Sequence, residues 1–240
     1  MTLQVQGLTK AFRGLVAVKD VSFDVKPNEI VALIGPNGAG KTTCFNVIAG
    51  ALNPTSGSVK FEGREMIGRL PEQIAVDGVV RTFQIVRPMK GMTVLENAMI
   101  GAFAHTSRVA DAADQALVAL SKVGLQKKAD LLADGLTLPD RKMLEMARAI
   151  AARPRLLLLD EVMAGLRPSE SDGIVSVVKD LHAGGMTILL IEHVMRVVMA
   201  LAQRVVVLHH GEKIAEGTPA EIGSNEAVIE SYLGKKAKLA

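Results

Sequence analysis

Short apolar runs alternate along the chain with longer segments whose apolar residues recur at helical spacing. Three runs contain no polar residue and predict parallel strands that are buried on both faces: Val31–Ile34, Leu156–Leu159 and Ile188–Ile191. Mixed or shorter β-rich runs occupy residues 3–8, 21–25, 58–63, 79–83, 204–211 and 213–217. Amphipathic helical patterns occupy residues 41–52, 169–185 and 194–203. Strands that alternate with helices predict an α/β fold with a mostly parallel central sheet.

The middle of the chain departs from this alternation. Helical patterns follow one another there with little strand signal, at residues 93–103, 109–125 and 141–152. We therefore expect a helical subdomain over residues 85–155, inserted into an α/β core formed by residues 1–84 and 156–240. A further helical pattern at residues 227–234 predicts a helix that docks near the end of the sequence.

Composition narrows the class of protein. With 49% hydrophobic and 22% charged residues, the chain is expected to fold rather than to stay disordered. A net charge of +3 is too small to argue for a nucleic-acid partner. The single cysteine, Cys44, fits a reducing compartment and is expected to be a buried packing residue, although a helix N-terminus could lower its pKa. With no signal-peptide pattern and no long apolar run, we expect a cytoplasmic protein.

The stretch Gly35–Thr42, GPNGAGKT, matches the phosphate-loop pattern G-x-x-x-x-G-K-[ST] between an apolar strand and a helix. Gly38 and Gly40 let successive backbone N–H groups curl around phosphate oxygens at the positive end of the helix. Lys41 would reach the β- and γ-phosphates, and the Thr42 hydroxyl would bind Mg²⁺. The residues expected to contact the phosphates of ATP are Gly35, Pro36, Asn37, Gly38, Ala39, Gly40, Lys41, Thr42 and Thr43.

A second candidate site lies where the apolar strand at residues 156–159 ends in two carboxylates. Asp160 would serve as a ligand or water-mediated anchor for Mg²⁺. Glu161, one residue further on, would orient or deprotonate the water that attacks the γ-phosphate. A strand that simply ends in two acidic residues is the plainer interpretation, and the independent phosphate loop argues against it.

Taken together, these residues resemble an ATP-binding-cassette (ABC) ATPase over nearly the whole chain. The resemblance implies a P-loop NTPase core with an antiparallel β subdomain and an inserted helical subdomain. It also places Gln84 at the Q-loop, where it senses Mg²⁺ and γ-phosphate, and His193 at the switch that contacts the γ-phosphate. Phe12 stands where the family stacks an aromatic ring on adenine, although it could be ordinary core. The D-loop, which crosses the dimer interface, corresponds to Ala164, Gly165, Leu166 and Arg167.

A finer resemblance is to the ATPase subunits of bacterial branched-chain amino-acid importers, carried by residues 81–103, 144–171 and 189–222. It implies an ATP-hydrolysing subunit that uses ATP and Mg²⁺ and binds no nucleic acid. Its partners would be a second ABC ATPase subunit, two membrane permease subunits and, indirectly, a periplasmic solute-binding protein. The subunit would be peripheral on the inner face of the cell membrane.

The family signature L-S-G-G-Q, which closes over the ATP of the opposite subunit, corresponds here to LTLPD. Thr137 keeps a hydroxyl, whereas Leu138 and Pro139 replace the glycines and restrict close backbone approach. Asp140 adds a negative charge that only Arg141, Lys142, the helix N-terminus or an outward turn could offset. Either the segment is a well-capped helix start whose phosphate role has faded, or it is a tolerated variation.

This divergence leads to the hypothesis of a heterodimer with two unequal ATP sites, with a homodimer as the alternative. Two other functions fit the motifs less well. One is a soluble ABC ATPase in DNA repair or translation, against which stand the single cassette and the modest charge. The other is a regulatory nucleotide-binding module with weak hydrolysis, against which stand Asp160, Glu161 and His193.

Overall fold

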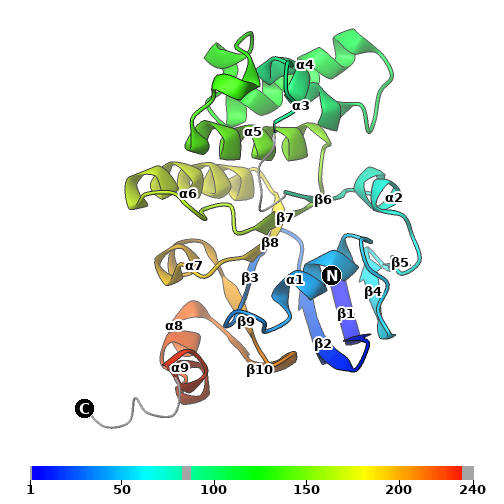
Figure 1. Ribbon diagram of the computed structural model, residues 1–240, viewed down its shortest axis with the longest axis vertical. Helices are drawn as coiled ribbons and strands as arrows, with labels where there is room; N and C mark the ends of the chain where they lie inside the picture. The colour runs from blue at the N-terminus through cyan, green and yellow to red at the C-terminus, as the bar shows by residue number, and fades with distance from the viewer. Residues whose placement is uncertain (1, 83–87, 234–240) are drawn as a thin grey trace. The chain divides into compact units, whose positions relative to one another are not determined.

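The computed structural model describes residues 2–82 and 88–233. By internal contacts the chain divides into two compact units. Unit 1 contains residues 1–71 and 187–240, and unit 2 contains residues 72–186. The expected helical segment, residues 85–155, falls inside unit 2, which also contains two strands and a long helix outside that segment (Figure 1).

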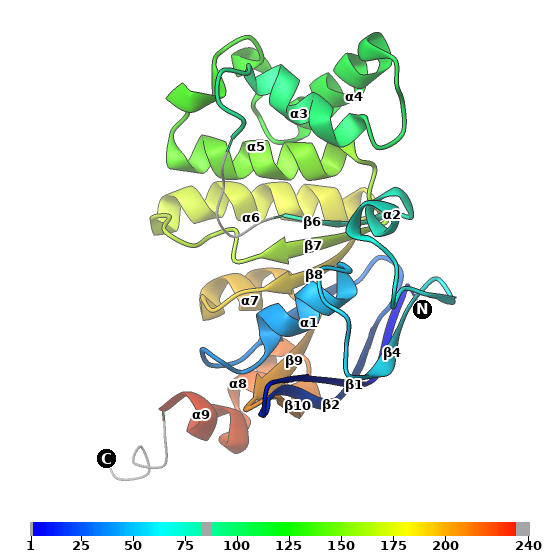
Figure 2. The same cartoon turned by 45° about the vertical axis from the view of Figure 1, so that its right-hand side comes forward.

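An antiparallel sheet forms one part of unit 1, with strand order β2-β1-β4-β5. Its strands are β1 (Leu3–Phe12), β2 (Leu15–Val25), β4 (Ser56–Phe61) and β5 (Arg64–Glu65). β1 pairs with β2 from Leu3↔Val25 to Phe12↔Leu15, and these strands lie side by side in both ribbon views (Figure 2). Inward-facing residues such as Val5 and Val21 are buried while their neighbours are more exposed, which is the period-2 pattern of a sheet covered on one face.

The other part of unit 1 places four strands in the order β10-β9-β3-β8. They are β3 (Ile30–Ile34), β8 (Thr187–Ile191), β9 (Arg204–His209) and β10 (Glu212–Gly217). β3 pairs in parallel with both β8 and β9, and every residue of β3 and β8 is buried. The helices of this unit are α1 (Lys41–Ile48), α7 (Met195–Leu201), α8 (Pro219–Gly223) and α9 (Glu226–Leu233).

Unit 2 contains the parallel pair β6 (Val79–Arg81) and β7 (Leu156–Asp160). Its helices are α2 (Pro71–Val76), which starts at the unit boundary, α3 (Val94–Ala102), α4 (Val109–Lys122), α5 (Leu138–Ala151) and α6 (Pro168–Ala183), with short 3-10 turns η1 (Gln126–Lys128) and η2 (Ala133–Gly135). Among the described residues of either unit, no helix is long and apolar enough to cross a membrane.

Helices α3, α4 and α5 pack on one another (Figure 1). Thr93 and Glu96 form a capping box at the start of α3, which satisfies N–H groups that a helix start leaves open. Where α3 meets α5, a Cβ on Gly101 would lie 1.9 Å from the Arg148 carbonyl oxygen, so only glycine fits this contact. Arg148 in turn donates to the buried Asn97 side chain at 3.0 Å. The three helices therefore form a close-packed group held by apolar and polar contacts.

Candidate functional site

The phosphate loop of unit 1 is a turn between β3 and α1, as the pattern predicts. Gly38 and Gly40 have φ values of 79° and 100°, in the left-handed region that favours glycine. Gly40 is the N-cap of α1, so the loop ends where the helix begins, at Lys41. The first N–H groups of a helix have no partner within the helix and therefore favour the binding of anions.

Close backbone contacts explain why glycine is needed at both ends of the loop. A Cβ on Gly35 would lie 2.1 Å from the Leu208 carbonyl oxygen, and one on Gly40 would lie 2.5 Å from the Ala17 carbonyl oxygen. The Gly211 N–H also donates to the Ala39 carbonyl at 3.2 Å. β2 and the β9–β10 turn therefore support the loop from outside.

Lys41 is the first residue of α1 and is 7% exposed. Its ammonium donates to the carbonyl oxygens of Gly35 at 2.8 Å and Pro36 at 3.0 Å. The side chain thus folds back across the loop that it is expected to serve. Thr42 is exposed and Thr43 is half-buried.

Cys44 is fully buried, and burial raises the pKa of its thiol to about 12. Its position near the start of α1 does not lower that pKa, because removal from water outweighs the helix dipole. The expectation of a buried packing residue is confirmed.

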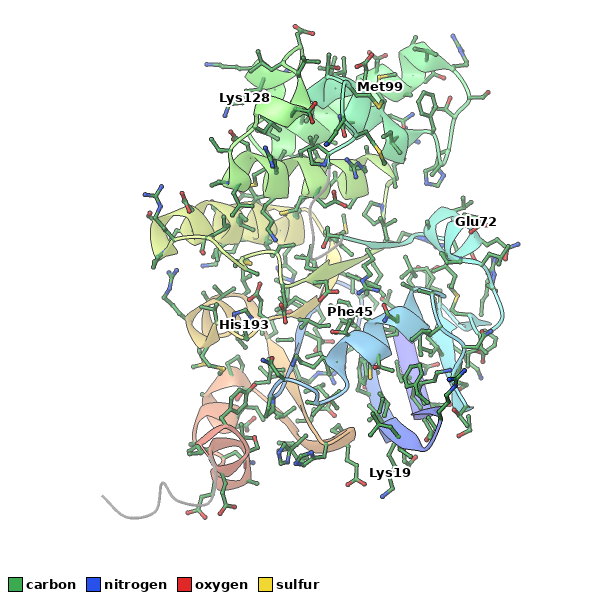
Figure 3. The ribbon with its side chains drawn as sticks, in the orientation of Figure 1. Lys19, Phe45, Glu72, Met99, Lys128 and His193 are labelled. Carbon is green, nitrogen blue, oxygen red and sulfur yellow. The ribbon has the colours of Figure 1, made fainter. Side chains whose placement is uncertain are left out.

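Two further candidates of unit 1 lie at the ends of strands. His193 is separated from the end of β8 by one residue, Glu192, and is exposed (Figure 3). Phe12 is the last residue of β1 and is 41% exposed, which excludes the interpretation as ordinary core in unit 1. The Lys10 ammonium lies 5.0 Å from the centre of the Phe12 ring, within the range of a cation–π contact.

The C-terminal helix α9 reaches the phosphate loop, which the sequence did not predict. Burial raises the pKa of the Tyr232 phenol, and a hydrogen bond with the Gly35 backbone opposes that shift. Tyr232 is the only tyrosine of the chain. The tyrosine therefore lies beside the first residue of the loop.

Asp160 and Glu161 lie in unit 2, at the carboxyl end of β7. The Asp160 side chain is 3% exposed, and its Oδ2 lies 2.5 Å from Nη2 of Arg81. Glu161 is half-buried with φ of 46°, an uncommon backbone conformation for a residue other than glycine. Such strain is frequent at functional sites, and it turns Glu161 out of the strand direction that Asp160 follows.

The segments that the sequence predicts as D-loop and signature are neighbours within unit 2. Ala164–Arg167 form the turn between β7 and α6, and Gly165 has φ of 80°. A Cβ on Gly165 would lie 3.5 Å from the Leu138 side chain. Arg167 is the N-cap of α6, where its backbone N–H donates to Glu170 at 2.8 Å.

The signature segment is a capped helix start, as proline and aspartate there predict. Thr137 is the N-cap of α5, with Pro139 in the first turn. The Thr137 hydroxyl accepts from the Asp140 N–H at 3.4 Å and donates to Asp140 Oδ2 at 2.9 Å. The one hydroxyl proton of the signature is therefore used by the chain's own carboxylate.

The charge of Asp140 is neutralised by Lys128 of η1, whose Nζ lies 2.6 Å from Oδ2 (Figure 3 labels Lys128). The sequence offered Arg141, Lys142, the helix N-terminus or an outward turn to offset this charge, and it did not name Lys128. Arg141 instead donates to the carbonyl oxygens of Leu136 and Asp134, both at 2.9 Å, and Lys142 is 3% exposed. A side chain on a helix points back toward its N-terminus, and a cation from the preceding turn reaches the carboxylate more directly.

Gln84 lies outside the described residues. Besides Tyr232, sequence reasoning missed Arg81 and Lys128. Arg81 carried a signal, because a charged residue interrupts an otherwise apolar strand run in VVR. Lys128 carried none, because its partner lies twelve positions further on in another element.

Among the described residues, no group of three or more His, Cys, Asp and Glu side chains forms a metal cage. Mg²⁺ does not need one, because it is commonly held by one or two carboxylates together with substrate phosphates. Asp160 fits that role, since its carboxylate already holds a cationic group in Arg81.

A family model described as ABC transporter matches residues 18–164. The chain belongs to the ABC transporter family. A second model, described as branched-chain amino acid ATP-binding cassette transporter, matches residues 212–238, which contain β10, α8 and α9. Membership confirms the predicted ABC ATPase fold and class.

Similar proteins span the same length. The high-affinity branched-chain amino acid transport ATP-binding protein LivG of Salmonella typhimurium is 41% identical, over 97% of this chain and 98% of that protein. BraF of Pseudomonas aeruginosa, which has the same description, is 40% identical over the same shares. A crystal structure of a nucleotide-free ATP-binding cassette from an ABC transporter aligns with a TM-score of 0.89 and 31% identity, over 98% of this chain and 99% of that one. An ADP-bound form of such a cassette aligns equally well, with a TM-score of 0.89.

Proposed function

We propose that the chain is the ATP-binding and ATP-hydrolysing subunit of a bacterial ABC importer for branched-chain or related amino acids. The observation that carries the solute class is the match of the C-terminal segment, residues 212–238, to the branched-chain amino-acid transporter model. The full-length similarity to LivG and BraF supports it. The same similarity disfavours a soluble ATPase of DNA repair or translation.

We assign the nucleotide roles to residues of both units. Gly35–Thr43 would surround the ATP phosphates, with Lys41 leaving the Gly35 and Pro36 carbonyls to reach the β- and γ-phosphates. Phe12, exposed at the end of β1, would stack on adenine. Thr42, Asp160 and Gln84 would hold Mg²⁺, which supplies charge neutralisation to the phosphates when bound.

Hydrolysis would be assigned to Glu161 and His193. Glu161 would orient or deprotonate the attacking water, a task to which a half-buried carboxylate that is turned out of its strand is suited. His193, exposed after β8, would contact the γ-phosphate and detect its loss. These groups are all present, which favours hydrolysis over a purely regulatory role.

The partner arrangement rests on the signature. Because Asp140 uses the Thr137 hydroxyl proton and a proline stands in the first turn of α5, this signature offers less to a facing γ-phosphate than L-S-G-G-Q would. We therefore propose a heterodimer with a second ABC ATPase subunit whose own signature faces Lys41. Two membrane permease subunits and, indirectly, a periplasmic solute-binding protein would complete an importer, with this subunit on the inner face of the membrane.

Uptake of radiolabelled leucine by cells that produce the complete importer tests the proposal. Lys41→Ala should abolish uptake, because the hydrolytic site completed by an intact signature contains Lys41. The equivalent lysine change in the partner ATPase should cost clearly less. Equal losses would exclude unequal sites, and leucine uptake that does not depend on Lys41 would exclude the function itself.

A further inference from the structure

One buried ion pair joins β6 to the carboxylate at the end of β7. Nη2 of Arg81 lies 2.5 Å from Oδ2 of Asp160. Both side chains are largely removed from water, with exposed fractions of 12% for Arg81 and 3% for Asp160. A carboxylate buried without a cation is strongly destabilising. Arg81 therefore supplies a counter-charge that Asp160 needs as long as no metal is bound.

The backbone on both sides of this pair is fixed. β6 and β7 pair in parallel with Arg81 opposite Leu158. The Thr82 N–H donates to the Leu158 carbonyl at 2.9 Å, and the Thr82 hydroxyl accepts from the Asp160 N–H at 3.3 Å. Because these bonds fix the register of the two strands, Arg81 can leave Asp160 only by rotation of its own flexible side chain.

Metal and guanidinium make competing demands on this carboxylate. Mg²⁺ demands near-ideal octahedral geometry and is usually held by one or two carboxylates together with substrate phosphates and water. Two cations on one poorly hydrated carboxylate repel each other, and little water is present to screen them. The Asp160 carboxylate therefore binds a metal most readily once its ion pair with Arg81 is broken.

We propose that Arg81 is a stand-in cation at Asp160 and that Mg²⁺ displaces its guanidinium when metal and nucleotide bind. The inference rests on the proposed function, since it takes Asp160 as a metal ligand. Arg81 is then a positioning residue. It keeps the carboxylate in place without metal and weakens metal binding by the free energy of the ion pair that must be broken.

The test measures ADP binding by titration calorimetry on the full chain, once with Mg²⁺ and once with a chelator. The quantity of interest is the factor by which Mg²⁺ tightens ADP binding. In Arg81→Met this factor should rise roughly tenfold over that of the unchanged protein, equivalent to ~1.4 kcal/mol. Mg²⁺ also binds ADP in solution. This contribution is the same in the titrations of both proteins, so it cancels when their two factors are compared. An unchanged or smaller factor would overturn the proposal.

Thermal unfolding supplies a second readout that needs no turnover. Arg81→Met should melt lower than the unchanged protein in chelator and should gain more from Mg²⁺ with ADP, because the metal replaces the missing charge. Arg81→Gln, which is neutral but can still donate a hydrogen bond, should show the same direction if the methionine variant folds poorly. Arg81→Lys keeps the charge and should keep the original factor.

Arg148→Met is the matched control. Arg148 forms another largely buried ion pair of unit 2, with Nη1 3.1 Å from Glu145 and exposed fractions of 16% and 5%. Its loss should lower the melting temperature without changing the Mg²⁺ factor. If Arg148→Met raised the factor as much as Arg81→Met, the effect would be one of general loosening and the proposal would fail. Absence of ADP binding in the unchanged protein would instead contradict the proposed function.

Discussion

Nζ of Lys128 lies 2.6 Å from Oδ2 of Asp140, and the same oxygen accepts the Thr137 hydroxyl proton at 2.9 Å. This pairing explains how a carboxylate can occupy the start of α5, in the segment that we propose faces the partner's nucleotide. The charge is neutralised by a side chain from η1 and by the helix N-terminus. Because of this pairing, the Thr137 hydroxyl proton is already donated to Asp140.

Loss of Lys128 should therefore affect turnover more than folding. In the assembled importer, Lys128→Met should lower ATP turnover about fivefold (~1 kcal/mol), because an unneutralised Asp140 would repel the nucleotide bound by the partner and so oppose the dimer closure that the Lys41 site also needs. The stability loss should be under ~1 kcal/mol, since the Lys128 side chain is 42% exposed and solvent screens the pair. Steady-state ATPase assays and denaturant melts measure the two effects.

Two variants keep this prediction specific. Lys127→Met, at the exposed neighbouring position of η1, should leave turnover unchanged. Asp140→Asn added to Lys128→Met should restore turnover, because it removes the charge that Lys128 neutralises. A double variant as slow as Lys128→Met alone would show that the ion pair does not act through charge.

Sequence reasoning located the strands that are buried on both faces, because β3, β7 and β8 each contain a short continuous apolar run of the kind typical of covered parallel strands. It missed the first half of β2, where Leu15 and Val16 are exposed and the pattern is a hairpin edge. It also missed α2 and α8, which are too short to show helical periodicity.

Among the site residues, too, some could be predicted from the sequence and others could not. The phosphate loop could be predicted because its chemistry depends on residues that are consecutive in sequence. The pairs Arg81–Asp160 and Lys128–Asp140 could not, because each joins two elements whose meeting depends on tertiary packing. The position of Tyr232 beside Gly35 was missed for the same reason.

Gly101→Ala should destabilise unit 2 by about 1–3 kcal/mol, the usual cost of overpacking. The new Cβ would lie 1.9 Å from the Arg148 carbonyl oxygen, so α3 and α5 must move apart. The matched control is Gly173→Ala within α6, whose Cβ would meet only the Met143 side chain at 3.9 Å. That change should stabilise the protein by up to ~1 kcal/mol, because alanine favours helix over glycine. Urea melts that rank the two variants the other way would contradict the α3–α5 contact.

Cys44 should be almost inert toward thiol reagents in the folded protein. With a pKa of about 12, it is nearly all thiol at pH 8, and it is also fully buried. Reaction with an aromatic disulfide reagent, followed by absorbance, should be at least about a hundredfold slower than in denaturant, where the pKa returns to about 8.5. Equal rates would show that α1 opens readily or that the thiol is exposed.

The acid stability of unit 1 should depend on Arg204. Burial alone would raise the pKa of Glu29, but hydrogen bonds from Arg204 and the Lys26 backbone lower it below its ordinary 4.5. Burial would also raise the pKa of Glu216, but Lys213 and Arg204 outweigh burial and lower this pKa below 4.5. A carboxylate with a lowered pKa stabilises the fold above its unfolded pKa, and that stability is lost as the pH falls through the folded value.

Arg204→Met should therefore cost about 2 kcal/mol at pH 7, and the cost should shrink below about pH 4 as the carboxylates become protonated. Urea melts at several pH values measure this difference. Lys19→Met removes an exposed pair with Glu212, whose side chains are 64% and 53% exposed, and should hardly change the melts (Figure 3). If Arg204→Met lowered the free energy of unfolding by the same amount at pH 7 and pH 3, the expected dependence of this stability on carboxylate protonation would be contradicted.

The proposed heterodimer is tested most directly by the mass of purified Glu161→Gln protein in solution, measured by light scattering with and without Mg-ATP. Slowing hydrolysis traps any closed dimer that the chain can form alone. Because the Thr137 hydroxyl is engaged by Asp140, we expect a protein that binds ATP but keeps the mass of one chain, and that gains mass only when the partner ATPase is added. An ATP-dependent homodimer would contradict the heterodimer and show that LTLPD closes over nucleotide.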